Sequence, residues 1–421
     1  MNRRSPAGPG ADAPDPASIP FGDGMNQIPP LNRSHGLTTG RGRRLLIPER
    51  SRGEARVEPI ELFFDLVFVF AATRLTHLLV ERMTPGGAGE TLLLLMAIWS
   101  AWSFTTWTTS WFDSRTLPVR ALLIGIMLGS LFMSAAIPEA FGEHGLAFAA
   151  AYVTIQVGRN GLTFFAIGRG HPLTGNFLRV LIWSVVLGTI WIAGALTEGD
   201  RRVTLWALAV AIDYVVTWFG FPVPGLGHSR TAEWSIAGEH LAERNELFII
   251  LALGESILLT GTTFAGLPRS GATVAAVIVA FVGSVALWWL YFDRSAMVGR
   301  EAIAHTDNPG WLGLSAYTYF HLPMVAGIIL AAGADELTIA HPLDRATSAL
   351  AVLALGGPAL YLIGNVLFTW ELSRRVPWSR LVAITALVAL VPLAADAPAL
   401  MLLTAATVIV VALVVWDVRG R

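Results

Sequence analysis

Apolar stretches of about 20 residues recur along the chain from residue 57 onward, and they constrain the fold more than any other feature. A helix of that length crosses the hydrocarbon core of a bilayer, whereas barrel strands are shorter and alternate in polarity. Charged residues make up only 14% of the 421 residues, while soluble globular chains carry about 25%. Too little charge is left to cover a soluble surface. The sequence therefore predicts an all-α, polytopic integral membrane protein.

The apolar stretches predict about 12 transmembrane helices, arranged as two parallel six-helix repeats. Residues 1–56 are rich in Pro, Gly and Arg and are expected to form a disordered cytoplasmic tail. The first membrane repeat is predicted over residues 57–221, a connecting loop over 222–239, and the second repeat over 240–418. The individual spans are predicted at residues 58–80, 90–112, 119–137, 145–168, 177–197, 203–221, 240–263, 273–293, 311–333, 347–370, 379–395 and 397–418.

The distribution of arginine favours an even number of spans with both termini in the cytoplasm. All 29 basic residues are arginines; this topology places 21 of them in inner segments and 5 in outer loops. Membrane proteins retain positive charge on the cytoplasmic side in this way. The first 30 residues contain no apolar core of a signal peptide, so the tail is expected to stay inside.

Short sequence matches recur in the same order in the two halves, at offsets of 185, 180 and 205 residues. A unit of six spans returns the chain to the same side of the membrane, so the predicted repeats are parallel. In proteins built this way the binding site lies between the halves. The matched pairs are Glu61-Leu62-Phe63 with Glu246-Leu247-Phe248, Trp111-Phe112-Asp113 with Tyr291-Phe292-Asp293, and Arg159-Asn160 with Gly364-Asn365.

The absence of lysine and cysteine excludes several chemistries. A P-loop and a Schiff base both need lysine, and disulfides, thiolate metal sites and thiol nucleophiles need cysteine. The net charge of −1 gives no general attraction to nucleic acid. No metal-binding spacing such as HExxH occurs. We therefore expect no metal, no cofactor, no nucleic-acid partner and no recognisable catalytic set.

Acidic residues form a stripe along the first predicted span. Glu58, Glu61 and Asp65 share one helical face because they are three and four residues apart. A cation could pass along such a stripe, and Asp65 lies deep enough to need a partner or a proton. The alternative is that these acids simply favour the positive end of the helix dipole.

The seventh predicted span is the most polar. His240 and Arg244 share one face, and Glu243 lies on another, so this helix is expected to be central in the bundle. Glu255 lies further along, beside Gly254, and is a candidate pathway residue. The alternative for Glu255 is a structural ion pair with Arg74 or Arg159.

Arg74 and Arg159 fall within predicted spans, where an unpaired charge is costly. Their expected partners are Asp65, Glu255 or Asp213, and a role in anion binding or gating stays open as the alternative. The tryptophans of the second span are expected to serve packing and the interfacial belt. These tryptophans are Trp99, Trp102, Trp107 and Trp111.

Two motifs resemble those of a known family. The segment Glu58-Pro59-Ile60-Glu61-Leu62-Phe63-Phe64-Asp65-Leu66-Val67-Phe68-Val69-Phe70 resembles the opening motif of the bacterial low temperature requirement A (LtrA) family. His240-x-x-Glu243-Arg244 followed by Gly254-Glu255-Ser256-Ile257 resembles its second motif. The resemblance covers about residues 55–418 and implies a multi-pass protein of the bacterial inner (plasma) membrane. The carried-over motif residues are Glu61, Asp65, His240, Glu243, Arg244, Gly254 and Glu255.

The leading functional hypothesis is a transporter or channel for an ion or small solute. Proton coupling is the favoured version, because a desolvated carboxylate can titrate near neutral pH. The first alternative is a membrane enzyme acting on a lipid or isoprenoid, with a groove beside His240 and Glu243. The second is a sensor or scaffold whose polar residues hold the bundle together. The expected partners are the lipid bilayer and a small ion or solute, and the sequence assigns no oligomeric state.

Overall fold

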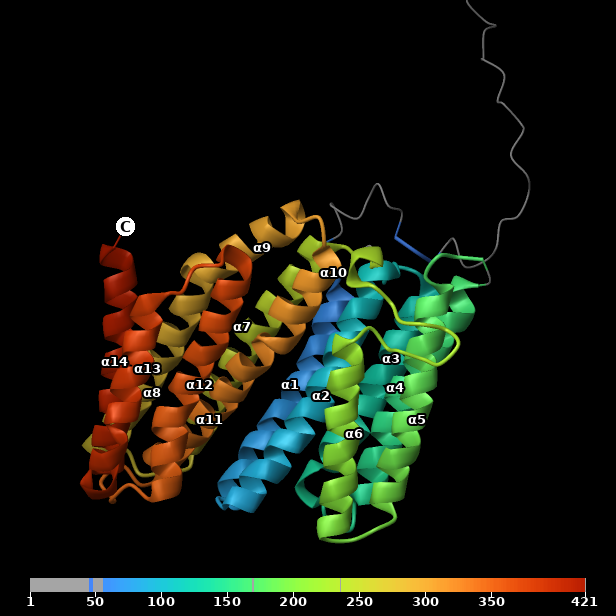
Figure 1. Ribbon diagram of the computed structural model, residues 1–421. Helices are drawn as coiled ribbons and strands as arrows, with labels where there is room; N and C mark the ends of the chain where they lie inside the picture. Colours follow the sequence, from blue (N-terminus) through green and yellow to red (C-terminus); the bar gives the residue numbers. More distant parts are fainter. Residues whose placement is uncertain (1–44, 48–55, 169, 235, 421) are drawn as a thin grey trace, which may run out of the picture. The chain divides into compact units, whose positions relative to one another are not determined.

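The computed structural model describes residues 45–47, 56–168, 170–234 and 236–420, all within a compact unit that spans Gly40–Arg421 (Figure 1). In these residues the secondary structure is helical, and pairing of extended backbone is limited to isolated bridges. The prediction of an all-α fold is therefore confirmed. Most of the predicted tail lies outside the described residues. Its residues 45–47 bond to the end of the second helix, through Ile47 N to Trp111 O at 2.9 Å and Asp113 N to Leu45 O at 2.8 Å.

The helices fall into two groups that follow the chain. The first group, here called the N-terminal bundle, comprises α1 (Pro59–Glu81), α2 (Pro85–Trp111), α3 (Leu117–Ala135), α4 (Gly145–Ile167), α5 (Thr174–Ala195) and α6 (Asp200–Trp218). The second group, the C-terminal bundle, comprises α7 (Gly238–Ala265), α8 (Gly271–Leu290), the π-helix η5 (Tyr291–Ser295), α9 (Ala296–His305), α10 (Pro309–Leu312), the π-helix η6 (Gly313–Tyr319), α11 (His321–Ala340), α12 (Ser348–Ser373), α13 (Trp378–Ala389) and α14 (Ala399–Arg419). Short 3₁₀ turns lie at η3 (Ile137–Glu139), η4 (Thr231–Glu233) and η7 (Val391–Asp396).

Local sequence sets where the helices begin. Proline occupies the first helical position of α1 and of α2, where its missing N–H costs nothing. Threonine or serine caps α2, α8 and α12: Thr84, Ser270 and Thr347 each accept a hydrogen bond from the backbone N–H three residues on. Glu61 reaches back to the backbone N–H of Glu58 at 3.0 Å and so closes a capping box at the start of α1.

Eight helices in the described part of the chain are long and apolar enough to cross a membrane. They are α1, α3, α5, α7, α12, α14 and two continuous segments, Gly271–His305 and Pro309–Ala340. Each of the other predicted spans is also helical, but α2, α4 and α6 are not among the eight, and α13 is a shorter apolar helix of 12 residues. Large apolar side chains such as Phe132 (64% exposed) and Phe165 (76%) face outward. Such faces suit a lipid environment.

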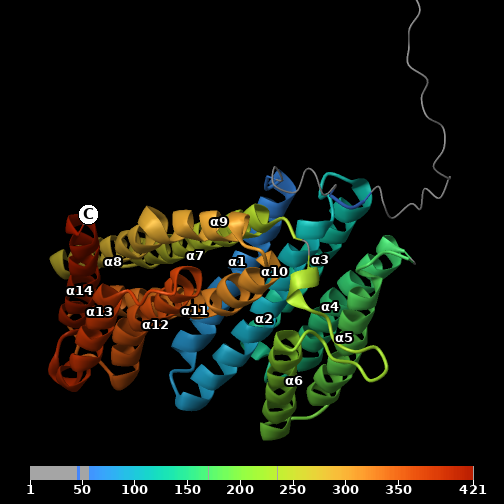
Figure 2. The same cartoon turned by 45° about the horizontal axis from the view of Figure 1, so that its top comes forward.

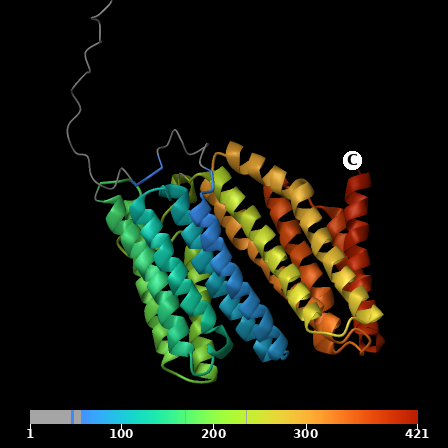
Figure 3. The same ribbon diagram turned by 180° about the vertical axis from the view of Figure 1, so that it is seen from behind.

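Helix α1 joins the two bundles. It packs against α2 and α3 on one side and against α7 and α11 on the other. Figure 3 shows α1 lying beside α7, and Figure 2 shows α9 lying along α7 at one end of the C-terminal bundle. Consequently the polar faces of α1 and α7 meet in the interior, between the two groups of helices.

Helices α11 and α12 approach each other closely through glycine. A Cβ atom added at Gly327 would lie 2.5 Å from the backbone N of Tyr361 and 2.6 Å from the carbonyl O of Gly357. Both neighbours are backbone atoms that cannot rotate away. Only glycine therefore fits at this crossing.

We expect Gly327→Ala to destabilise the folded protein by about 1–3 kcal/mol, because the added methyl group overpacks the α11–α12 contact. The melting temperature of the detergent-solubilised protein measures the effect. Gly125→Ala in α3 is the matched control, since no atom lies within 4 Å of a Cβ at that position. Equal melting temperatures for the two variants would contradict this account of the crossing.

Candidate functional site

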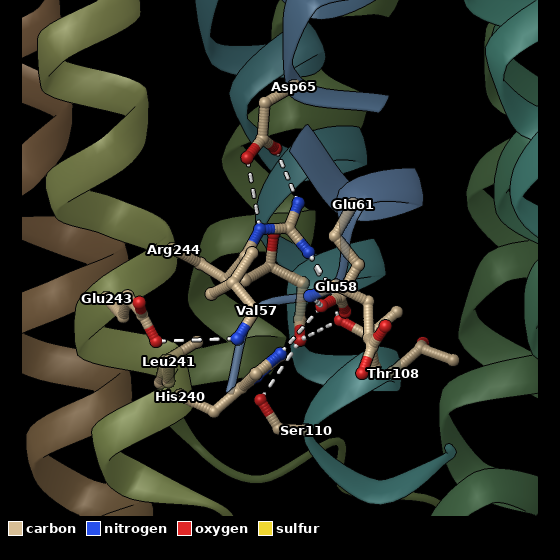
Figure 4. Close-up of polar contacts among 12 residues, drawn as sticks. Val57, Glu58, Glu61, Asp65, Thr108, Ser110, His240, Leu241, Glu243 and Arg244 are labelled. Atoms are coloured by element: carbon tan, nitrogen blue, oxygen red, sulfur yellow. Dashed lines mark hydrogen bonds and ion pairs between the residues drawn. The ribbon is translucent and has the colours of Figure 1, made fainter. Parts of the chain in front are cut away.

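The candidate site lies where the first turns of α1 face the first turns of α7 (Figure 4). Glu61 and Asp65 are one turn apart on α1, and His240 and Arg244 are one turn apart on α7. The side chains of Glu61, Asp65 and Arg244 are fully buried, and His240 is 2% exposed. We call these four residues the interbundle cluster. The structure thus brings together residues that are about 180 positions apart in the sequence.

Arg244 is held by Asp65 in a two-pronged ion pair. Its Nε donates to Asp65 Oδ2 at 3.1 Å, and its Nη2 donates to Asp65 Oδ1. Nη1 donates to Thr109 Oγ1 at 3.3 Å and lies 3.3 Å from Glu61 Oε1. The fork of the guanidinium matches the two oxygens of a carboxylate, so this pair fixes both distance and orientation between the helices.

His240 completes the cluster beside Glu61. Its Nε2 lies 2.9 Å from Glu61 Oε2, the oxygen that also accepts the backbone N–H of Glu58. With Glu61 ionised, Nε2 carries a proton and donates it. Within the described residues, the other ring nitrogen, Nδ1, is buried without a hydrogen-bond partner. Nδ1 is therefore free to accept a further proton.

The charges of the interbundle cluster do not balance when His240 is neutral. Two carboxylates then face one guanidinium, which leaves a net charge of −1 in a buried site. Protonation of His240 would bring the cluster to neutrality. An uncompensated charge in a buried site is costly.

The remaining residues of the two motifs lie outside the cluster. Glu243 is half-buried at its edge, where its Oε2 accepts the backbone N–H of Val57 at 3.4 Å. Glu255 lies about 16 Å beyond Arg244 along α7. It accepts a hydrogen bond from Thr73 Oγ1 of α1 at 2.5 Å. The expected pairing of Glu255 with Arg74 or Arg159 is thus replaced by a hydroxyl contact across the same α1–α7 interface.

The expected pairing of Arg74 with a buried carboxylate is not found within the described residues. Arg74 is nine positions after Asp65, which places it on the opposite face of α1. Its Nε is buried without a hydrogen-bond partner in this part of the chain. Asp65 has Arg244 as its partner instead.

Arg159 and Asp213 are satisfied separately, by neutral groups. Arg159 donates from Nη1 to the carbonyl of Ala101 and to Thr105 Oγ1, both at 3.2 Å. Asp213 accepts from Ser100 Oγ at 2.7 Å. All three partners belong to α2. Hydrogen bonds to this polar helix therefore replace the expected ion pair between Arg159 and Asp213.

Helix α2 carries the tryptophans that were expected to serve packing and the interfacial belt, and one of them is a polar partner in the interbundle cluster. Trp102 is 1% exposed, and its Nε1 donates to Asp65 Oδ1 at 2.7 Å. The other tryptophans of the set, Trp99, Trp107 and Trp111, are also buried. A signal was present in the run of Thr and Ser residues from Thr105 to Ser110, because a polar face with few charges suits a helix enclosed by other helices.

Comparisons with known proteins agree with the resemblance noted in the motifs. Residues 56–415 match the family described as "Bacterial low temperature requirement A protein (LtrA)". The chain is 39% identical over 362 residues to an uncharacterized protein of Rhizobium meliloti (strain 1021), covering 85% of this chain and 88% of that protein. No solved structure matches the chain. In the described residues no group of three or more His, Asp or Glu side chains could hold a metal ion.

Replacing Arg244 with glutamine should lower the free energy of unfolding by about 3–5 kcal/mol, because two buried carboxylates lose their counter-charge. Asp65→Asn in the same chain should recover part of that loss. Thermal unfolding of the single and double variants in detergent measures the coupling. Arg82→Gln is the control, since its pair with Glu90 is partly exposed and worth at most about 1 kcal/mol. Equal losses in Arg244→Gln and Arg82→Gln would contradict the assignment.

Proposed function

The chain belongs to the bacterial low temperature requirement A family, and we propose that it is a membrane transporter or channel for an ion or small solute, with proton coupling. The observation that carries the proposal is the interbundle cluster, which has one negative charge in excess when His240 is neutral. A buried proton acceptor between two helical bundles suits transport, because movement of the bundles can expose it to either side in turn.

The proposed architecture has twelve spans in two parallel repeats, with α1 and α7 as equivalent first helices. Hydrogen bonds between the fourth and fifth helices of each proposed repeat support this architecture. Asn160 of α4 donates to Ser184 of α5 at 2.6 Å, and Asn365 of α12 accepts from Arg380 of α13 at 2.5 Å. Each asparagine thus links the fourth helix of its proposed repeat to the fifth. On this view the interbundle cluster lies at the contact between the repeats.

Two polar contacts along the α1–α7 interface define the proposed path. The first is the interbundle cluster, and the second is the contact between Thr73 and Glu255. The two are separated by about 16 Å along α7, or roughly half the thickness of the hydrocarbon core. We infer that Glu255 is the next proton-binding group along the interface.

The burial of His240 favours transport over the alternative of a lipid-modifying enzyme. His240 is 2% exposed, so a lipid headgroup has no direct access to its ring. General acid–base chemistry needs the catalytic group within hydrogen-bond reach of the substrate. A proton can instead reach a buried imidazole through transient water. The described geometry therefore supports ion movement better than headgroup chemistry.

We expect His240→Gln and Glu255→Gln to lower proton flux into proteoliposomes at least about tenfold, by removing titratable groups from the interface. Glutamine can still donate to Glu61 and accept from Thr73, so both variants should stay folded. A pH-sensitive dye inside the liposomes reports protons, and a second dye reports potassium. Glu90→Gln, at the partly exposed pair with Arg82, should keep wild-type flux.

Absence of flux for any ion or solute with the wild-type protein would refute the transport proposal. It would leave the enzyme and scaffold alternatives. Normal flux in both folded variants would show that transport does not depend on the α1–α7 interface.

Labelling of single cysteines would test the twelve-span topology, and the natural chain contains no cysteine that could give background. The variants Glu198→Cys and Asp344→Cys should react with a membrane-impermeant maleimide added to spheroplasts. The variants Arg115→Cys and Glu301→Cys should react only after the membrane is permeabilised. All four positions are exposed, so reactivity reports the side of the membrane. Labelling of all four from outside would contradict the topology.

A further inference from the structure

A second buried polar site lies within the C-terminal bundle. A cavity of about 30 Å³ is lined by Asp335 of α11, Ser256 of α7, Ser284 of α8 and Thr407 of α14. The four side chains are 6%, 4%, 7% and 8% exposed, respectively. We call these four residues the Asp335 site. A cavity of this volume has room for one ion or one or two water molecules.

The polar groups of the Asp335 site have no protein partners in the described part of the chain. There, Asp335 makes no ion pair or hydrogen bond, and the hydroxyls of Ser256, Ser284 and Thr407 make none either. Buried polar groups in proteins are almost always satisfied, and an unpaired carboxylate is the costliest to leave. Four such groups from four helices around one cavity therefore point to a ligand.

The backbone of α12 offers a candidate fifth oxygen. Pro358 lies within the continuous helix α12 and has no N–H, so it cannot donate the usual helical hydrogen bond to the carbonyl of Ala354. Both Ala354 and Pro358 line the cavity. A proline in the interior of a membrane helix commonly frees a carbonyl in this way, and the freed oxygen needs another partner.

The chemistry of these groups selects the ligand. All of the potential donors are oxygens, namely one carboxylate, three hydroxyls and one carbonyl, which hard cations prefer. A single carboxylate balances one positive charge, whereas sites for divalent cations gather more than one carboxylate or keep several waters. The small volume favours a compact, dehydrated ion.

We propose that the Asp335 site binds a sodium ion. The Asp335 carboxylate supplies the balancing charge, and the hydroxyl and carbonyl oxygens replace water around the ion. This site is separate from the interbundle cluster and goes beyond the proposed function, since sodium binding at equilibrium requires no transport. Ser256 directly follows Glu255, so α7 carries the proton path on one face and the Asp335 site on another.

Melting curves of the detergent-purified, full-length protein test the proposal, with sodium chloride replaced stepwise by choline chloride at constant ionic strength and pH. Sodium should raise the melting temperature of the wild type, as any ligand of the folded state does. Asp335→Asn should abolish the shift. It should also melt higher than the wild type in choline chloride, because it removes an unpaired buried carboxyl group.

Two further variants keep the test independent of Asp335. Thr407→Val should weaken the apparent sodium affinity about tenfold, because the site loses one of its oxygens. Thr404→Val, one turn away on α14, is the matched control, since the Thr404 hydroxyl already bonds to the carbonyl of Leu400 at 2.6 Å. Thr404→Val should bind sodium as the wild type does.

Potassium chloride in place of sodium chloride tests selectivity and should give a much smaller shift. Equal melting temperatures of the wild type in sodium and choline chloride would overturn the proposal. A sodium shift that persists in Asp335→Asn would overturn it as well. If the wild-type protein binds sodium but moves no protons, only the transport proposal fails. The two proposals can therefore fail separately.

Discussion

The rest of the structure depends on one interaction, the pairing of Arg244 with Asp65 and Glu61 between α1 and α7. In a buried, water-poor environment each of these charges alone would cost several kcal/mol. Their pairing ties the first helix of the N-terminal bundle to the first helix of the C-terminal bundle. It also explains why α7 can carry charge on the face that meets α1.

The same interaction leaves a surplus of one negative charge. The cluster that holds the two bundles together is therefore also the candidate site for proton binding. A fully balanced cluster would only hold the bundles together. Because Glu61 and Asp65 face one arginine, His240 can change the total charge between −1 and zero by taking up a proton. A proton-dependent charge at the contact between two bundles can bias their arrangement, which is what the proposed transport function needs.

Polar groups without partners are informative elsewhere in the molecule too. Arg159 and Asp213 are deeply buried, yet α2 satisfies them with hydroxyl and carbonyl groups, so they are well explained as structure. Asp335 and the three hydroxyls around it have no such explanation among the described residues. The difference between satisfied and unsatisfied burial separates structural polar residues from candidate binding residues.

The sequence by itself determined the all-helical fold, the approximate positions of the helices and the residues of the interbundle cluster. Apolar length, proline and threonine at helix starts, and costly charges within spans are local properties that a sequence displays directly. Only the tertiary structure decided which charges pair. Arg74 lies on the opposite face of α1 from Asp65 because the two are nine residues apart. The packing of α7 against α1 places Arg244, about 180 positions away in the sequence, beside Asp65. The Asp335 site was likewise beyond the sequence, because its four side chains come from four helices whose arrangement depends on the packing of the whole bundle.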